Sequence, residues 1–261
     1  MTQHEKPTFD LAYRPESYWD TLEQIFANIK GQRRREIIQE AVEAGQVRTL
    51  GDALFEDQSW QIVDGVRALQ RQHPGQVHLV LGNHDHGHVG GPRLAKFYAD
   101  EVAQLESRLS AAQVAQLREL FSQALLLALA PCGLFLSHGS PEETHFDLAR
   151  LDRAALDPRQ NSPEDNAMLR SLLTSYGQPQ ETCARLLDLV SAQSGLDLGV
   201  VVHGHDRDEE GWFMEGDNQL CPVLFGAPRQ EKRYLEIDLG GRYRSAADLR
   251  DGVELKRLHP G

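Results

Sequence analysis

The segment Gly82-Asn83-His84-Asp85 places three side chains with chemical capacity next to one another. Asn83 offers an amide oxygen, His84 an imidazole that can give or accept a proton, and Asp85 a carboxylate. The apolar residues at 77–81 come directly before it and predict a buried strand. Because ligands bind at the carboxyl ends of strands in α/β proteins, this segment is a candidate site. A strand followed by an ordinary polar turn has the same local pattern, so this segment alone leaves both interpretations open.

Three other segments repeat the pattern of an apolar strand that ends in glycine beside histidine or aspartate. They lead to Asp52, to His138 and to His205. Together with Asn83 they offer one carboxylate, one amide oxygen and two imidazoles, a donor set that suits Mn, Fe or Zn. The neighbouring glycines fit such a site, because the backbone must turn sharply where side chains converge. Each glycine–histidine pair is weak by itself, but the ordered set predicts a divalent metal site.

The segments between these motifs alternate between strands and helices, which predicts an α/β fold. A strand at 47–50, a helix at 58–72 and the strand at 77–81 have the order of a parallel crossover unit. Later in the chain we expect a helical stretch at 93–130 broken near Ser110, a strand at 133–137, surface loops and short helices at 142–178, a helix at 181–193, a strand at 198–202, and strands at 211–215, 220–225 and 233–239 that form an antiparallel meander. Residues 1–46 are expected to form a helical extension, and residues 47–261 one domain.

The composition narrows the class of protein. The 27 Lys and Arg against 39 Asp and Glu give a net charge of -12, which argues against binding nucleic acid or an anionic membrane. Three widely spaced cysteines, Cys132, Cys183 and Cys221, show no zinc or disulfide pattern and favour reduced thiols in a cytoplasmic protein. The polar N-terminus lacks an apolar signal core, and the apolar run at 124–130 is too short to span a bilayer.

The order of the motifs resembles the calcineurin-like metallophosphoesterase superfamily. The matching motifs are Gly51-Asp52, Gly82-Asn83-His84-Asp85, His138-Gly139 and Gly204-His205. The resemblance covers residues 47–240 and is closest to the phosphoprotein phosphatase branch, which includes the serine/threonine phosphatases. It implies a four-layer αββα sandwich, in which helices flank two mixed sheets.

The resemblance also implies how the metal would be held. Asp52 would bridge two metal ions, and Asn83, His138 and His205 would complete the shell of the second ion. The implied reaction is hydrolysis of a phosphomonoester, in which metal ions, Mn²⁺ first and Fe or Zn otherwise, clamp the phosphoryl oxygens. The implied substrate is phosphoserine or phosphothreonine in a protein, or a small phosphorylated metabolite.

Four further residues receive roles from their positions in these motifs. His84 would be the general acid that protonates the leaving alkoxide, and Asp85 stands beside it where the family commonly has Glu or Asp. Arg229 is a candidate phosphate ligand, since guanidinium matches phosphate oxygens. His203 occupies another position where the family has a basic residue, and it is a second candidate for substrate binding.

The sequence departs from the family at its opening D-x-H motif, which supplies ligands to the first metal. Before Asp52 the chain has a single histidine, His4, and no strand leads to it. Three interpretations follow. The site holds one ion, or a first ion is rebuilt from His86, His88 or Asp57, or the chain is a catalytically degenerate phosphatase fold that binds a partner without turnover.

Overall fold

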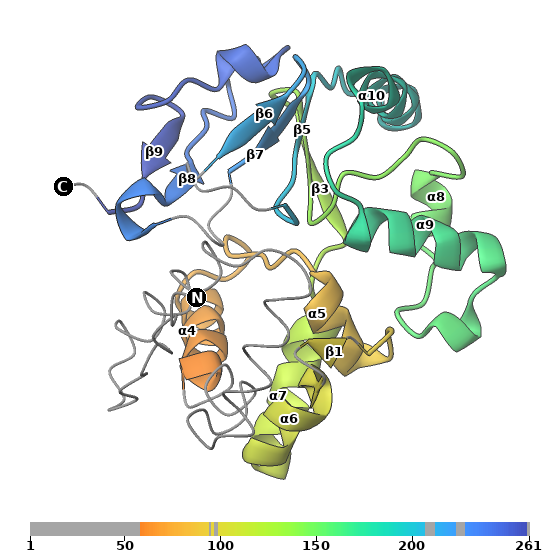
Figure 1. Cartoon of the computed structure of the whole chain (residues 1–261), viewed down its shortest axis with the longest axis vertical. Helices are drawn as coiled ribbons and strands as arrows, with labels where there is room; N and C mark the ends of the chain where they lie inside the picture. The colour runs from red at the N-terminus through yellow and green to blue at the C-terminus, as the bar shows by residue number, and fades with distance from the viewer. Residues whose placement is uncertain (1–57, 94, 97–98, 207–211, 223–227, 260–261) are drawn as a thin grey trace, which may run out of the picture.

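The computed structural model describes residues 58–259 apart from 94, 97–98, 207–211 and 223–227. This part of the chain has an α/β fold with seven α-helices, a mixed five-stranded sheet and two small two-stranded sheets. The five-stranded sheet occupies the upper half of the view in Figure 1, and helices α4 to α7 occupy the lower half. The extension predicted at 1–46 and the strand predicted at 47–50 lie outside the described residues. No helix of the described part is long and apolar enough to cross a membrane.

The five-stranded sheet has the order β3-β4-β5-β7-β6. Its strands are β3 (Leu127–Ala130), β4 (Leu134–Ser137), β5 (Val200–Val202), β7 (Gln219–Cys221) and β6 (Phe213–Glu215). The central strands β4, β5 and β7 run parallel, while β3 and β6 are antiparallel at the two edges. The strands predicted at 133–137 and 198–202 are therefore confirmed. Because β4, β5 and β7 run parallel, the residues that follow them emerge at the same end of the sheet.

Both faces of this sheet are buried. On one face Phe135 and Val201 pack in a cluster with apolar residues of α8 (Leu148–Leu151), α9 (Pro163–Thr174) and α10 (Gln180–Ser194). On the other face Leu134 and Val200 pack with Tyr243 and Leu249 from the C-terminal part of the chain. Each buried leucine, valine or phenylalanine contributes about 1.5–3 kcal/mol. The central strands are therefore packed on both sides by apolar side chains.

A second core lies at the other end of the molecule. Leu81 packs there with apolar residues from α4 (Gln58–Gln72), α6 (Glu101–Arg108) and α7 (Ala111–Ser122). The predicted helix at 58–72 is confirmed, as is the break at Ser110. Ser110 is the N-cap of α7, because its Oγ accepts a hydrogen bond from the Gln113 backbone N–H and the Gln113 side chain accepts one from the Ser110 N–H.

The helical stretch predicted at 93–130 is wrong at both of its ends. Residues near its start form a small hairpin of β1 (Ala95–Lys96) and β2 (Ala99–Asp100). Its last residues form β3, which pairs along its whole length with β4. A short apolar run fits a strand or a buried helix equally well, and here the pairing with a neighbouring strand decides.

The predicted strand at 77–81 is reduced to one isolated bridge, between Val80 and Leu125 in parallel. Two hydrogen bonds flank it, from Leu81 N–H to the Leu125 carbonyl and from Leu125 N–H to the Leu79 carbonyl, each 2.8 Å. This segment ends at Gly82, so the short ladder still fixes where Asn83 begins.

The predicted C-terminal meander is partly wrong. β6 and β7 are antiparallel as expected, but β7 also pairs in parallel with β5. The next strand, β8 (Arg233–Leu235), pairs with β9 (Leu255–Arg257) in a separate two-stranded sheet. The parallel contact between β5 and β7 brings the ends of these two strands together.

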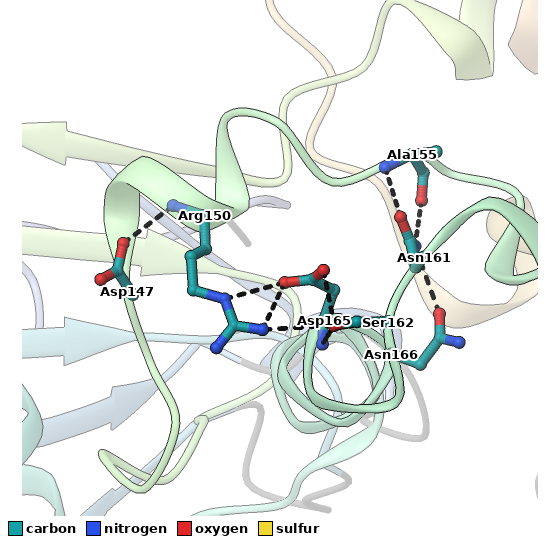
Figure 2. A network of polar contacts seen from close by, with 7 residues as sticks. All are labelled: Asp147, Arg150, Ala155, Asn161, Ser162, Asp165 and Asn166. Atoms are coloured by element: carbon teal, nitrogen blue, oxygen red, sulfur yellow. Dashed lines mark hydrogen bonds and ion pairs between the residues drawn. The ribbon is translucent and has the colours of Figure 1, made fainter.

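The segment predicted as loops and short helices at 142–178 contains α8, a 3-10 turn at Pro158–Gln160 and the longer helix α9. Figure 2 shows the polar network that joins them. Arg150 of α8 pairs with Asp165 in the first turn of α9 at 2.8 Å, and Asn161 exchanges hydrogen bonds with both backbone groups of Ala155. This network fixes the loop over the same sheet face that α9 and α10 cover.

Candidate metal centre

Three segments bring Asn83, His138 and His205 to one place. Asn83 is the first residue of the one-turn helix α5 (Asn83–His86), His138 directly follows β4, and His205 lies three residues after β5. The Gly204 backbone N–H donates a hydrogen bond of 2.9 Å to the His138 carbonyl, which joins the two strand-end loops. Three of the four predicted metal ligands are therefore adjacent, and the fourth, Asp52, lies outside the described residues.

The spacing of the three side chains fits a shared ion. His138 Nε2 lies 3.1 Å from Asn83 Oδ1 and 3.0 Å from His205 Nδ1. A ring nitrogen carries either one N–H or one lone pair, which points outward in the ring plane. His138 Nε2 therefore has one hydrogen-bonding position to share between these two neighbours. Adjacent ligands of an octahedral ion with bonds of about 2.1 Å lie about 3.0 Å apart. The donor set and its spacing thus suit one divalent ion.

The electrostatics of the cluster favour the ligand form of both histidines. Burial lowers the pKa of His138 to about 4, helped by repulsion from His205 and His84. Burial also lowers the pKa of His205, against the attraction of Asp206, and the charge of His84 adds to the lowering. The two rings are therefore neutral at neutral pH, and only a neutral imidazole has a lone pair for a metal.

Gly82 allows the close approach of these groups. Its φ of -95° and ψ of 166° are those of extended backbone. The sharp turn that the sequence predicted at this glycine therefore does not use a positive φ. A Cβ on Gly82 would instead lie 3.1 Å from His138 Cε1 and 3.1 Å from Asp85 Oδ2. The His138 ring packs directly against this backbone, so a larger residue at position 82 would have to displace the ring or the Asp85 carboxylate by a few tenths of an ångström.

His84 is half exposed and has a partner that the sequence did not suggest. Its Nδ1 forms a very short contact with Glu101 Oε2, at the first residue of α6. The Glu101 side chain is 11% exposed, against 44% for His84. With Nδ1 directed at a carboxylate, the ring orientation is set and Nε2 is the ring nitrogen that does not face Glu101.

Asp85 lies at the start of the same helix. Its Oδ2 accepts a hydrogen bond of 3.0 Å from the Gly82 backbone N–H, so its carboxylate caps α5. Burial raises the pKa of Asp85, while the bond from Gly82 and the charges of His88 and His84 oppose that rise. The structure thus places Asp85 as a support for the turn that presents Asn83 and His84.

His86 and His88, the residues weighed as substitute ligands, have other partners. His86 is buried and its Nε2 lies 2.6 Å from the Leu156 carbonyl oxygen. His88 Nδ1 lies 3.0 Å from Glu106 Oε1. Both contacts tie the end of α5 and the turn that follows it to neighbouring segments. Asp57, the third candidate, lies outside the described residues.

Of the two predicted substrate-binding residues, only His203 has a described side chain, and it lies near the candidate centre, since burial and then the charges of His205 and His138 lower its pKa. Arg229 begins the 3-10 turn Arg229–Glu231, and its side chain lies outside the described part. His203 is buried, with 2% exposure, next to Asp206 and Cys221. These three side chains place one possible ligand atom each within 4.8 Å of one another, so this second cluster can hold a metal ion. Asp206 follows β5 in the sequence and is itself buried, at 8% exposure.

Tyr176 is a further residue that the sequence did not point to. Its ring centroid lies 4.8 Å from that of His205, and the residue is 64% exposed. The next residue, Gly177, donates a backbone hydrogen bond of 2.7 Å to Asp206 Oδ2. The loop after α9 therefore forms one wall beside the candidate metal centre, with an aromatic ring facing solvent.

Compared with models of known protein families and with curated proteins, the sequence matches none of them.

Proposed function

We propose that this chain is a metal-dependent phosphoesterase of the calcineurin-like metallophosphoesterase superfamily, related to the phosphoprotein phosphatases. The observation that carries the proposal is the meeting of Asn83, His138 and His205, with neighbouring ligand atoms 3.0 and 3.1 Å apart. These are the residues that the order of the motifs assigns to one metal shell. The proposal includes a four-layer αββα sandwich, of which the described residues contain one mixed sheet with helices on one face.

Asn83, His138 and His205 would hold the ion, together with Asp52 if that residue reaches them. Mn²⁺ is the first candidate, and Fe or Zn are the others, because all three accept mixed oxygen and nitrogen ligands. When bound, the ion supplies positive charge that binds the phosphoryl oxygens of a phosphomonoester and activates water. The number of ions per chain, one or two, depends on ligands before residue 58.

The protein groups have separate tasks in this proposal. His84 carries the proton for the leaving alkoxide on Nε2, while Glu101 holds the ring from the Nδ1 side. The buried carboxylate of Asp85 fixes the turn that carries His84 and Asn83. The proposed substrates are phosphoserine or phosphothreonine proteins and small phosphorylated metabolites. The proposed setting is the cytoplasm, in line with three buried, unbridged cysteines.

Metal content per chain and hydrolysis of an alkyl phosphate such as phosphoserine in added Mn²⁺ test the proposal together. We expect at least one ion per chain and turnover that both His84→Ala and Asp52→Asn strongly reduce. Turnover that survives both substitutions belongs to a contaminant. A preparation with no bound metal and no turnover contradicts the proposed function.

The second candidate function is binding without catalysis, on a degenerate phosphatase fold. The specific observation that favours it is the lack of the D-x-H motif, since His4 is the sole histidine before Asp52. Binding of a phosphoserine peptide by a metal-loaded chain with no turnover would select this alternative. Turnover that depends on His84 would exclude it.

A further inference from the structure

We propose that His203, Asp206 and Cys221 form a second metal site, separate from the candidate metal centre, for an ion of the zinc class. The pairing of two strands creates it. β5 and β7 are parallel with Val202 opposite Leu220, and the next residue on each strand is His203 or Cys221. The His203 backbone N–H donates a hydrogen bond of 3.0 Å to the Leu220 carbonyl, which keeps the strand ends together beyond the last paired residues.

The distances among the three donors are close to those around a tetrahedral ion. The His203 Nδ1 and Asp206 Oδ2 atoms are 3.6 Å apart, and all three ligand atoms lie within 4.8 Å of one another. Ligands at about 2.0–2.3 Å from a tetrahedral zinc ion are separated by about 3.3–3.8 Å. A modest side-chain adjustment therefore suffices to bring all three donors onto one ion.

The burial of the cluster also favours a cation. His203, Asp206 and Cys221 are 2%, 8% and 0% exposed. A carboxylate removed from water is costly unless a positive charge or several hydrogen bonds compensate it, and a divalent ion provides that charge. The Gly177 backbone N–H already holds Asp206 Oδ2 at 2.7 Å, a contact of the kind that orients ligating carboxylates.

The donor types select the ion. One thiolate, one imidazole and one carboxylate suit Zn²⁺, whereas Mg²⁺ and Ca²⁺ prefer oxygen ligands alone. Asn83, His138 and His205 contain no sulfur and favour a harder ion. The two donor sets share no residue, so this inference does not depend on the proposed phosphoesterase activity.

Co²⁺ is the probe that separates the two sites, because a cobalt–thiolate bond gives a charge-transfer absorption that nitrogen and oxygen ligands do not. We expect the full chain, freed of metal and titrated with Co²⁺, to develop this band with one equivalent, and Zn²⁺ to remove it. Cys221→Ser abolishes the band. Cys183→Ser, which changes another fully buried cysteine, keeps it, and so does His138→Ala.

The inference is overturned if the wild-type chain gives no thiolate band, or if the band is unchanged in Cys221→Ser. Asp206→Asn provides an independent measurement that leaves the thiol in place, in case Cys221→Ser fails to fold. We expect Asp206→Asn to weaken Co²⁺ binding at the thiolate site by about tenfold or more, since even indirect partners of ligands contribute that much. Unchanged affinity in a variant with the wild-type circular dichroism spectrum would also overturn it.

Discussion

The Asn83 amide oxygen lies 3.1 Å from His138 Nε2, although 55 positions separate the two residues in the chain. Asn83 belongs to a one-turn helix that follows the bridge between Val80 and Leu125, whereas His138 ends the central strand β4. Their contact therefore depends on the tertiary packing of two separate segments. If the contact marks a metal site, each residue must contribute to the affinity for the ion.

We expect Asn83→Ala and His138→Ala each to weaken Mn²⁺ binding by about tenfold or more, because each removes one ligand of the proposed ion. The double variant should lose less binding free energy than the two single variants lose together, since the two ligands act on one ion. Calorimetric titration of the metal-free chain measures all three affinities. His73→Ala, an exposed histidine outside the cluster, is the matched control and should bind Mn²⁺ like the wild type. Equal affinity for His138→Ala and wild type would contradict the assignment.

The contact between His84 and Glu101 leads to a prediction about the leaving group. An alkoxide needs a proton when it leaves, whereas a nitrophenolate does not. We expect His84→Ala to lower kcat for an alkyl phosphate by about 10²–10⁴ and to change kcat for p-nitrophenyl phosphate far less.

Glu101→Gln should give a smaller loss with the same preference for the alkyl substrate, because the ring keeps its nitrogen but loses its orienting carboxylate. Steady-state kinetics on both substrates measure the ratio. Glu119→Gln, which changes an exposed carboxylate on α7, is the control. An equal loss on both substrates in His84→Ala would mean that His84 has a task other than proton transfer.

The parts of the fold that the sequence predicted well are those with a strong local pattern. The helix at 58–72 has apolar residues at helical spacing, and β4 and β5 are apolar runs that end in polar residues. The residues at 124–130 are apolar at every position, which suits a helix or a strand. Residues 127–130 form a strand because they pair with β4, and the uniform apolar character of the run does not report that pairing.

The same distinction explains the candidate site. Asn83, His138 and His205 follow strand-like segments, so a general rule about strand ends anticipated their proximity. Glu101 begins a helix 17 residues after His84, and no motif connects the two. The neighbourhood of His203 and Cys221 depends on the parallel pairing of β5 with β7, where an antiparallel meander was expected.

Cys183 supports a prediction about alkaline pH. Burial, with a smaller effect of the Glu215 charge, raises its pKa from the usual 9.0 to about 12. Between these two pH values the unfolded chain releases the thiol proton and the folded chain keeps it. The folded state then binds more protons than the unfolded state, so this contribution to stability is complete below pH 9 and is lost as the pH rises toward 12.

Urea unfolding of wild type and Cys183→Ala at pH 8 and at pH 10.5 measures this effect. The difference in unfolding free energy between the two proteins should be smaller at pH 10.5, because groups common to both proteins cancel. At pH 8 the Cys183 thiol is protonated and buried, so iodoacetamide should modify it only after unfolding. A difference that stays constant with pH, or rapid alkylation of the native chain, would contradict this account of Cys183.

The turn between β3 and β4 carries the last prediction, because it aligns the strand that ends at His138. Gly133 in this turn has a φ of 107°, and a Cβ there would lie 2.3 Å from the Tyr243 carbonyl oxygen. Tyr243 cannot retreat easily, since its N–H donates a hydrogen bond of 2.7 Å to the Cys132 carbonyl. Gly195 also has a positive φ, 74°, but a Cβ there would meet nothing within 4 Å.

We expect Gly195→Ala to cost about 1–2 kcal/mol of unfolding free energy from backbone strain alone. Gly133→Ala should cost about 1–3 kcal/mol more, because the overlap forces the backbone to shift. Urea unfolding of the two variants compares these costs, and equal losses would mean that the turn and Tyr243 are not packed as closely as the structure has them.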